Sequence, residues 1–110
     1  LFDDKQPSIT LETPGGNKIV ISDEDKGIVL SDQNQNSITL NDSGISLKSP
    51  KDITLDATGK LTLKATQDVS IQGLNVKAAA NAQFKATGNA GAEVSTGAIA
   101  VLKGSLVQIN

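Results

Sequence analysis

The residues that could do chemistry in this chain are carboxylates, hydroxyls and lysines, because histidine, cysteine, methionine, tyrosine and tryptophan are all absent. Without histidine or cysteine, the Ser-His-Asp and Cys-His nucleophile systems and His/Cys zinc sites cannot be built. The densest acidic group is Asp23, Glu24 and Asp25. It lacks the ligand spacing of a calcium loop. We therefore expect a solvated turn there, with a weak cation site as the alternative.

Two other short motifs favour turns over chemistry. Residues 88–91, Gly-Asn-Ala-Gly, resemble a phosphate loop but lack its Gly-Lys-Ser/Thr ending. Residues 41–43 form an Asn-Asp-Ser sequon that we interpret as a turn and not as a glycan acceptor. Paired carboxylates can cleave glycosidic bonds, as in some single-chain β-helix enzymes. This enzyme reading is the least favoured one, and we expect no catalytic residue, no metal site and no cofactor.

The composition narrows the class of protein further. The chain has 110 residues, a net charge of −2 and only two aromatic residues, Phe2 and Phe84. That charge argues against a general nucleic-acid binder, and no apolar run is long enough to cross a membrane as a helix. Residues 1–56 carry a net charge of −5, whereas residues 57–110 carry +3 and hold every alanine. The lysines of the second half suit anionic lipid head groups, although ordinary surface variation explains the same split.

The chain repeats one short pattern, in which two branched apolar residues flank one polar or small residue. The first apolar residues of successive units are 10, 9, 10, 7, 8, 8 and 8 residues apart, so the spacing becomes an octad over residues 37–73. Beyond residue 73 the pattern weakens, and the whole chain holds about a dozen units. The eight clearest units begin at Ile9, Ile19, Ile28, Ile38, Ile45, Ile53, Leu61 and Val69.

Each unit has the alternation of a β-strand. Both flanking residues lie on one face of such a strand and the middle residue lies on the other. Glycine, asparagine and proline separate the units and supply turns, for example over residues 14–17, 41–44 and 49–52. We expect one domain over residues 1–110, with irregular opening repeats (1–36), regular octads (37–73) and an alanine-rich part (74–110).

Strands this short bury their apolar residues only by stacking on neighbours. A single-chain solenoid needs caps at both ends, and its coils cannot tolerate the uneven early spacing. In a symmetric trimer, all three copies change spacing at the same height. We therefore expect an all-β fold, an intertwined triple-stranded parallel β-helix (a trimeric β-prism) with octad repeats and no significant helix. Its core residues are Ile45, Leu47, Ile53, Leu55, Leu61, Leu63, Val69 and Ile71, with Ser46, Thr54, Thr62 and Ser70 outside.

Three stretches carry a resemblance to a known family. Residues 52–73 (DITLDATGKLTLKATQDVSIQG), residues 13–19 (TPGGNKI) and residues 104–110 (GSLVQIN) resemble the C-terminal spike of VgrG proteins. These proteins are the needle tips of type VI secretion and related contractile injection systems, akin to the cell-puncturing spike of phage tails. The family's N-terminal hub and OB-fold have no counterpart here, so we expect a piece of a longer protein. Some relatives hold iron at the tip through histidines, a feature that this histidine-free chain cannot share.

The resemblance implies a non-enzymatic, membrane-puncturing spike that assembles in the bacterial cytoplasm and is injected into a target cell. Its implied partners are two further copies, a hub and tube, a PAAR-repeat tip protein with effectors and, transiently, the target membrane, but no nucleic acid. The residues expected to carry the tip protein are Val107, Gln108, Ile109 and Asn110, which in the alternative only close the last layer. The alternative function is a trimeric stalk of a phage tail fibre or surface adhesin that binds a receptor.

The expected faces lead to a first prediction. Leu63→Asp places three carboxylates together at the threefold axis and should prevent assembly, because buried like charges are strongly unfavourable. Thr62→Asp is the matched control, and it should assemble like the wild type because its side chain faces solvent. Light scattering measures both masses. Equal behaviour of the two variants would show that the faces are reversed or that the fold is wrong.

Overall fold

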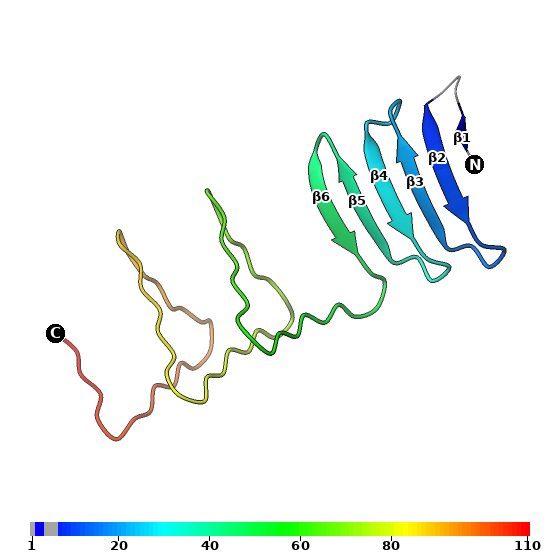
Figure 1. Cartoon of the computed structure of the whole chain (residues 1–110). Helices are drawn as coiled ribbons and strands as arrows, with labels where there is room; N and C mark the ends of the chain where they lie inside the picture. The colour runs from blue at the N-terminus through cyan, green and yellow to red at the C-terminus, as the bar shows by residue number, and fades with distance from the viewer. Residues whose placement is uncertain (1, 4–6) are drawn as a thin grey trace. The chain divides into compact units, whose positions relative to one another are not determined.

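The computed structural model describes residues 2–3 and 7–110, and this part of the chain contains strands, turns and bends but no helix (Figure 1). The expected all-β class without helix is thereby confirmed for the described residues, and none of them belongs to a helix that could cross a membrane. Residues 1 and 4–6 of the expected opening segment lie outside the described ones. The chain divides into two units, Leu1–Leu63 and Lys64–Asn110, which are described separately.

The first unit contains one sheet of six strands in sequence order, and every neighbouring pair is antiparallel. The sheet is therefore a meander of hairpins within one chain (Figure 1). Strand β1 has two residues and the other five strands have five each. The strands are β1 (Phe2–Asp3), β2 (Ser8–Glu12), β3 (Lys18–Ser22), β4 (Gly27–Ser31), β5 (Ser37–Asn41) and β6 (Gly44–Lys48).

The parallel pairing expected from the octads is wrong for residues 8–48. The expected core residues Ile45 and Leu47 lie opposite Leu40 and Ile38 of the same chain, in the β5–β6 hairpin. The physical reason is the length of the connections. Antiparallel strands can be joined by two residues, whereas parallel neighbours within one chain need a crossover of a dozen or more.

Loop length also explains the uneven spacing of the early repeats. The loops between successive five-residue strands cover residues 13–17, 23–26, 32–36 and 42–43. Adding each loop to one strand reproduces the spacings of 10, 9, 10 and 7 residues in the sequence. The early repeats are therefore irregular because they are hairpins, and the two-residue loop at Asp42 and Ser43 is the shortest of them.

The two five-residue loops, residues 13–17 and 32–36, are built alike. In each loop the first backbone N–H donates to the last carbonyl, from Thr13 to Asn17 at 2.9 Å and from Asp32 to Asn36 at 3.1 Å. The fourth residue of each loop has a positive φ, 101° at Gly16 and 70° at Gln35. Glycine adopts such angles without strain, whereas a residue with a Cβ does not.

After β6 the chain no longer pairs with itself. Residues 52–104 form extended stretches of five or six residues that are separated by two-residue bends, and residues 107–110 form the last stretch. The bends follow one another at intervals of eight residues, with one interval of seven. They keep this spacing beyond residue 73, where the apolar pattern of the sequence weakens. The bends lie at residues 50–51, 58–59, 66–67, 74–75, 81–82, 89–90, 97–98 and 105–106.

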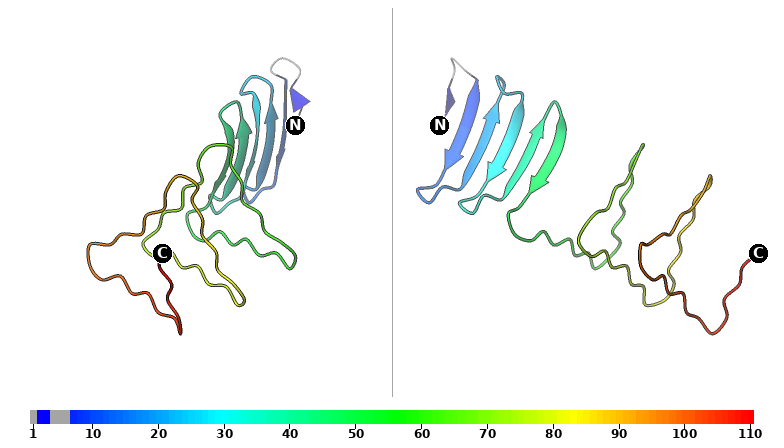
Figure 2. Two further views of the ribbon diagram at one scale, coloured as in Figure 1. Left: turned by 90° about the vertical axis from the view of Figure 1, so that its left-hand side faces the viewer. Right: turned by 180° about the vertical axis from the view of Figure 1, so that it is seen from behind.

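The second unit consists entirely of this repeating path. Residues 64–110 contain no strand, and Figure 2 shows them as an open, angular coil of straight stretches and corners. The residue just before each bend is always small. These eight residues are Ser49, Ala57, Ala65, Gly73, Ala80, Gly88, Thr96 and Gly104.

The equivalent positions in the two five-residue loops give a second prediction. Gly16→Ala should destabilise the protein by about 1 kcal/mol or more, because it forces a Cβ into a left-handed conformation. Gln35→Gly should instead raise the stability by up to about 1 kcal/mol, because it relieves the same strain. Thermal melts of the two variants measure both effects. Shifts of the same sign would contradict the equivalence of the loops.

Candidate assembly interface

One face of the sheet is made entirely of large apolar side chains. The strand register places these residues in two rows that run across β2 to β6. No polar residue interrupts either row. One row is Ile9, Ile21, Ile28, Leu40 and Ile45, and the other is Leu11, Ile19, Leu30, Ile38 and Leu47.

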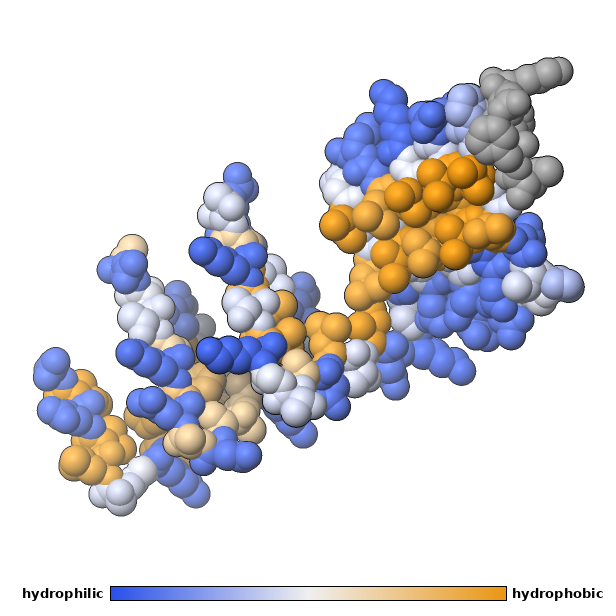
Figure 3. Space-filling model, in the orientation of Figure 1, coloured by the Kyte–Doolittle hydropathy of each residue, from blue (hydrophilic) through white to orange (hydrophobic). Residues whose placement is uncertain are grey.

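None of the described residues covers this apolar face. Among the described residues no apolar side chain is buried, and exposure on the face rises to 78% at Ile45. Figure 3 shows the side chains as a continuous apolar area over the sheet. A soluble monomer rarely exposes an apolar patch of this kind, and one sheet face needs a second layer to form a core. The face is therefore the candidate interface of the protein.

The opposite face of the sheet carries mostly polar side chains. Its central row contains Thr10, Val20, Val29, Thr39 and Ser46. At one end of the strands, Glu12 lies opposite Lys18 across the β2–β3 pair. This composition suits contact with water. The two faces of the sheet thus have opposite characters, as the alternation in the sequence predicts.

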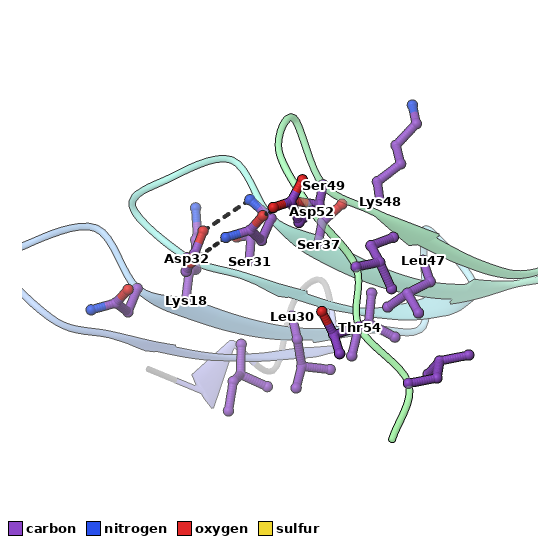
Figure 4. A pocket seen from close by; sticks show the side chains of 16 residues that line it. Lys18, Leu30, Ser31, Asp32, Ser37, Leu47, Lys48, Ser49, Asp52 and Thr54 are labelled. Carbon is purple, nitrogen blue, oxygen red and sulfur yellow. Dashed lines mark hydrogen bonds between the residues drawn. The ribbon is translucent and has the colours of Figure 1, made fainter. Parts of the chain in front are cut away.

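A groove lies between the apolar face and the segment that follows β6 (Figure 4). Its volume is about 530 Å³, and its walls combine sheet residues such as Leu30 and Leu47 with Ile53 and Leu55 of that segment. All of these residues belong to the first unit. Ile53 and Leu55 stay 53% and 62% exposed beside the groove, so the segment after β6 does not itself close the sheet.

A network of turn hydrogen bonds determines where the chain leaves the sheet. The Asn17 side-chain oxygen accepts from the Gln33 backbone N–H at 3.2 Å and so joins the two five-residue loops. The Ser49 hydroxyl donates to the side-chain oxygen of Asn36 at 2.6 Å. The same hydroxyl oxygen accepts from the Lys51 backbone N–H at 3.1 Å. Ser49, just before the first bend, is thereby hydrogen-bonded to the loop between β4 and β5.

Asp32 organises the loop at the centre of this network. Its carboxylate accepts from the side-chain amide and the backbone N–H of Asn36, each at 2.9 Å. It also accepts from the backbone N–H of Asn34 at 2.9 Å and from the Asn34 side-chain amide at 3.3 Å. The Asn36 side-chain bond, the Asn36 backbone bond and the Asn34 bonds lower the pKa of Asp32 from 3.8 to about 2, although desolvation opposes them.

From Ser49 onward the backbone N–H and C=O groups are not hydrogen-bonded to one another. Among the described residues, no backbone hydrogen bond joins two residues of 49–110. The one hydrogen bond with both partners in residues 52–110 runs from the Ala98 N–H to the Thr96 hydroxyl oxygen, at 3.1 Å. In a single-chain solenoid, successive coils would be hydrogen-bonded to each other. The structure therefore contradicts the solenoid and leaves the extended stretches open on both edges.

The eight residues expected in the core are all exposed in the single chain, from 52% at Leu47 to 78% at Ile45. Leu47, Ile53 and Leu55 meet in the groove. The other members lie on extended stretches, and their direction toward a threefold axis stays a prediction. The apolar residues of β2 to β5 lie outside the expected core, which began at Ile45, although their repeat units were visible in the sequence.

The remaining sequence motifs lie at bends and ends. Residues 23–26 form the exposed turn between β3 and β4, where Asp25 donates its N–H to the Ser22 hydroxyl oxygen at 3.1 Å. Among the described residues, no three His, Cys, Asp or Glu side chains gather as metal ligands. Residues 88–91 span a bend. Val107, Gln108, Ile109 and Asn110 follow the last bend as an exposed stretch, and their role in binding a tip protein stays a prediction.

Comparison with known families agrees with this geometry. Residues 8–59 match the family model of the phage baseplate V C-terminal trimerisation domain. The matched segment begins with β2, includes the entire apolar face and ends at the second bend. It supports a structural, phage-like spike relative and the formation of a homotrimer. No curated protein matches the chain.

The carboxylate of Asp32 gives a third prediction. Its pKa is lower in the folded protein than in the unfolded chain, so it stabilises the fold above pH 3.8 and loses this effect as the pH falls toward 2. NMR titration of the Asp32 carboxyl carbon should give a midpoint near 2. Asp32→Ala should lower the melting temperature at pH 7 more than Asp42→Ala, which removes the same charge from another turn. A midpoint near 4 would contradict the hydrogen-bond network.

Proposed function

We propose that the chain is one of three copies in a non-enzymatic spike, and that residues 49–110 of the three copies intertwine as a triple-stranded β-helix. The observation that carries this proposal is the unpaired backbone of residues 49–110. Extended stretches with free N–H and C=O groups on both edges require hydrogen-bond partners when they are buried. Two further copies on the same path supply those partners at every height.

The apolar sheet supports the same arrangement. Three sheets that turn their Ile and Leu rows toward one axis form a shared core, which no copy has alone. Each fully covered Ile or Leu side chain contributes roughly 1.5–3 kcal/mol, and one sheet presents ten of them. The polar small-residue face then meets water. A prism of this kind has no open side edges at which further chains could add.

The mechanical role follows from such an architecture. Strands that run across a rod place their hydrogen-bond ladders along its axis, so a thrust along the axis is shared by all layers. We propose that the rod is the membrane-puncturing spike of a contractile injection apparatus of the type VI secretion kind. Assembly in the bacterial cytoplasm and release into a target cell belong to this proposal. Val107, Gln108, Ile109 and Asn110 would carry a PAAR-repeat tip protein, and a hub and tube would bear the opposite end.

The fourth prediction tests the trimer and its dimensions. Light scattering should give about 34 kDa, three times the 11.3 kDa of one copy, and unfolding should depend on protein concentration. A stable, folded monomer at micromolar concentration would refute the proposal.

The length of the particle is a second readout of the same sample. One strand unit per layer, at about 4.8 Å per layer, gives a rod roughly 55–60 Å long, whereas a single-chain solenoid would reach only about 20 Å. Small-angle X-ray scattering distinguishes these lengths. A compact particle near the shorter value would remove the mechanical argument.

A further inference from the structure

The bends of the structure show which residues of successive octads are equivalent. Counted from the first residue of each bend, Asp52, Lys60 and Asp68 all lie two positions after it. Lys48, Asp56 and Lys64 all lie two positions before it. Both sets therefore recur every eight residues, and in both sets the sign of the charge alternates.

This alternation holds for all the charges that can be compared. Lys85 and Glu93 also occupy one position, four residues after successive bends. No two consecutive octads place charges of the same sign at an equivalent position between residues 48 and 110. Lys77 and Lys85 are eight residues apart, but the one seven-residue interval lies between their bends and shifts them out of equivalence.

The charged residues share a face with the small polar residues. Asp52 and Asp56 alternate with Ile53 and Leu55, so the two carboxylates lie on the same side of the stretch as Thr54. All of these residues are exposed in the chain. Within the part of the chain that the structure describes, neither Asp52 nor Lys60 takes part in an ion pair. Asp52 and Lys60 thus have no charged partner among the described residues of their own chain.

The proposed trimer brings equivalent positions of consecutive octads together. Each copy crosses one side of the prism and climbs one layer, so the stretch above octad n of one copy is octad n+1 of another. Neighbouring strands then run parallel, and a residue i faces residue i+8 of the next copy. In this register Asp52 faces a lysine at position 60, and Lys48 at the end of β6 faces an aspartate at position 56.

Other registers are penalised by the same charges. Pairing of octads two steps apart places Asp52 opposite Asp68 and Lys48 opposite Lys64, and pairing of identical octads places each charge opposite itself. Opposite charges that face each other across neighbouring strands are favourable, and like charges are unfavourable. The pattern therefore discriminates between registers that the apolar residues distinguish poorly, because the octads that carry these charges all place two branched apolar residues at the same positions.

We propose that two ladders of alternating charge, Lys48–Asp56–Lys64 and Asp52–Lys60–Asp68, set the register in which consecutive octads of different copies pair. The occupant of the free edge of β6 is accordingly the stretch 52–56 of a second copy. β6 is the last strand of its sheet, and no strand of the described residues pairs with its outer edge. This proposal rests on the trimeric spike proposed above and adds the identity of the paired residues.

Engineered disulfides test the register directly, because the chain contains no cysteine. The double variant Thr54→Cys/Thr62→Cys should give, after oxidation, a covalent trimer on a non-reducing denaturing gel. Each Cys at position 54 then lies beside the Cys at position 62 of another copy. The matched control is Thr54→Cys/Ser70→Cys, whose cysteines would be two layers apart and beyond the reach of a disulfide. It should stay uncrosslinked.

The outcomes separate this proposal from the proposed function. A native trimer in which only the 54/62 pair crosslinks supports both. A native trimer that crosslinks through 54/70, or through neither pair, overturns the register and leaves the trimer intact. A native monomer overturns both, as does a 54/62 disulfide that forms within one copy.

Charge reversal tests the cause of the register. Lys60→Asp places like charges beside Asp52 and Asp68 of neighbouring copies, and it should raise the concentration needed for half-assembly by about tenfold. The triple variant Asp52→Lys/Lys60→Asp/Asp68→Lys restores the alternation and should restore assembly. Lys51→Asp is the control, because the equivalent position of the next octad is Gly59. A triple variant as weak as Lys60→Asp alone would contradict the charge ladder.

Discussion

A backbone removed from water must exchange its hydrogen bonds with the solvent for hydrogen bonds with protein, and this demand governs the whole molecule. Residues 8–48 meet it within one chain, because short loops return each strand alongside the previous one. Residues 49–110 do not, since each bend sends the chain onward without a return. The pairing within the chain stops at Ser49. The Ser49 hydroxyl donates a hydrogen bond to the Asn36 side chain at the point where the chain leaves the edge of β6. Residues 8–48 thus pair within their own chain, whereas the backbone of residues 49–110 does not pair with itself.

The apolar side chains add a second dependence. The sheet has one strongly apolar face but only one layer, so its Ile and Leu rows find no core among the described residues of their own chain. The groove beside Leu47 likewise leaves apolar side chains uncovered at the point where the chain leaves the sheet. The further copies of the proposed trimer would supply partners both for the backbone and for these side chains.

Much of this could be predicted from the sequence, and the failures have physical reasons. The alternation around Thr54 and Thr62 predicts strands and faces, because the period of two is a local property. The direction of pairing is not local, and an apolar pair around one polar residue looks the same in both directions. The loop lengths indicate antiparallel pairing, above all the two-residue loop between β5 and β6.

In the candidate interface, too, contacts between residues close in the sequence could be predicted, and contacts between distant residues could not. The role of Asp32 follows from asparagines two and four residues further on, so a search for side-chain-to-backbone turns would have found it. The bond from Ser49 to Asn36 spans 13 residues and could not be found in that way. The charge ladders lie within the regular octads of residues 37–73, so their period of eight is visible in the sequence. The positions of the bends were needed only to show that Lys77 and Lys85, although eight residues apart, are not equivalent.

The single seven-residue interval between the bends at 74–75 and 81–82 has a consequence for how such a chain can evolve. In an assembly with threefold symmetry, one gene encodes all three sides, so the loss of a codon shortens every side at the same height. Symmetry survives such a change, whereas a solenoid would lose the alignment of one side with the next. A chain of the proposed trimer can therefore lose one residue from a repeat while the three copies keep their common axis.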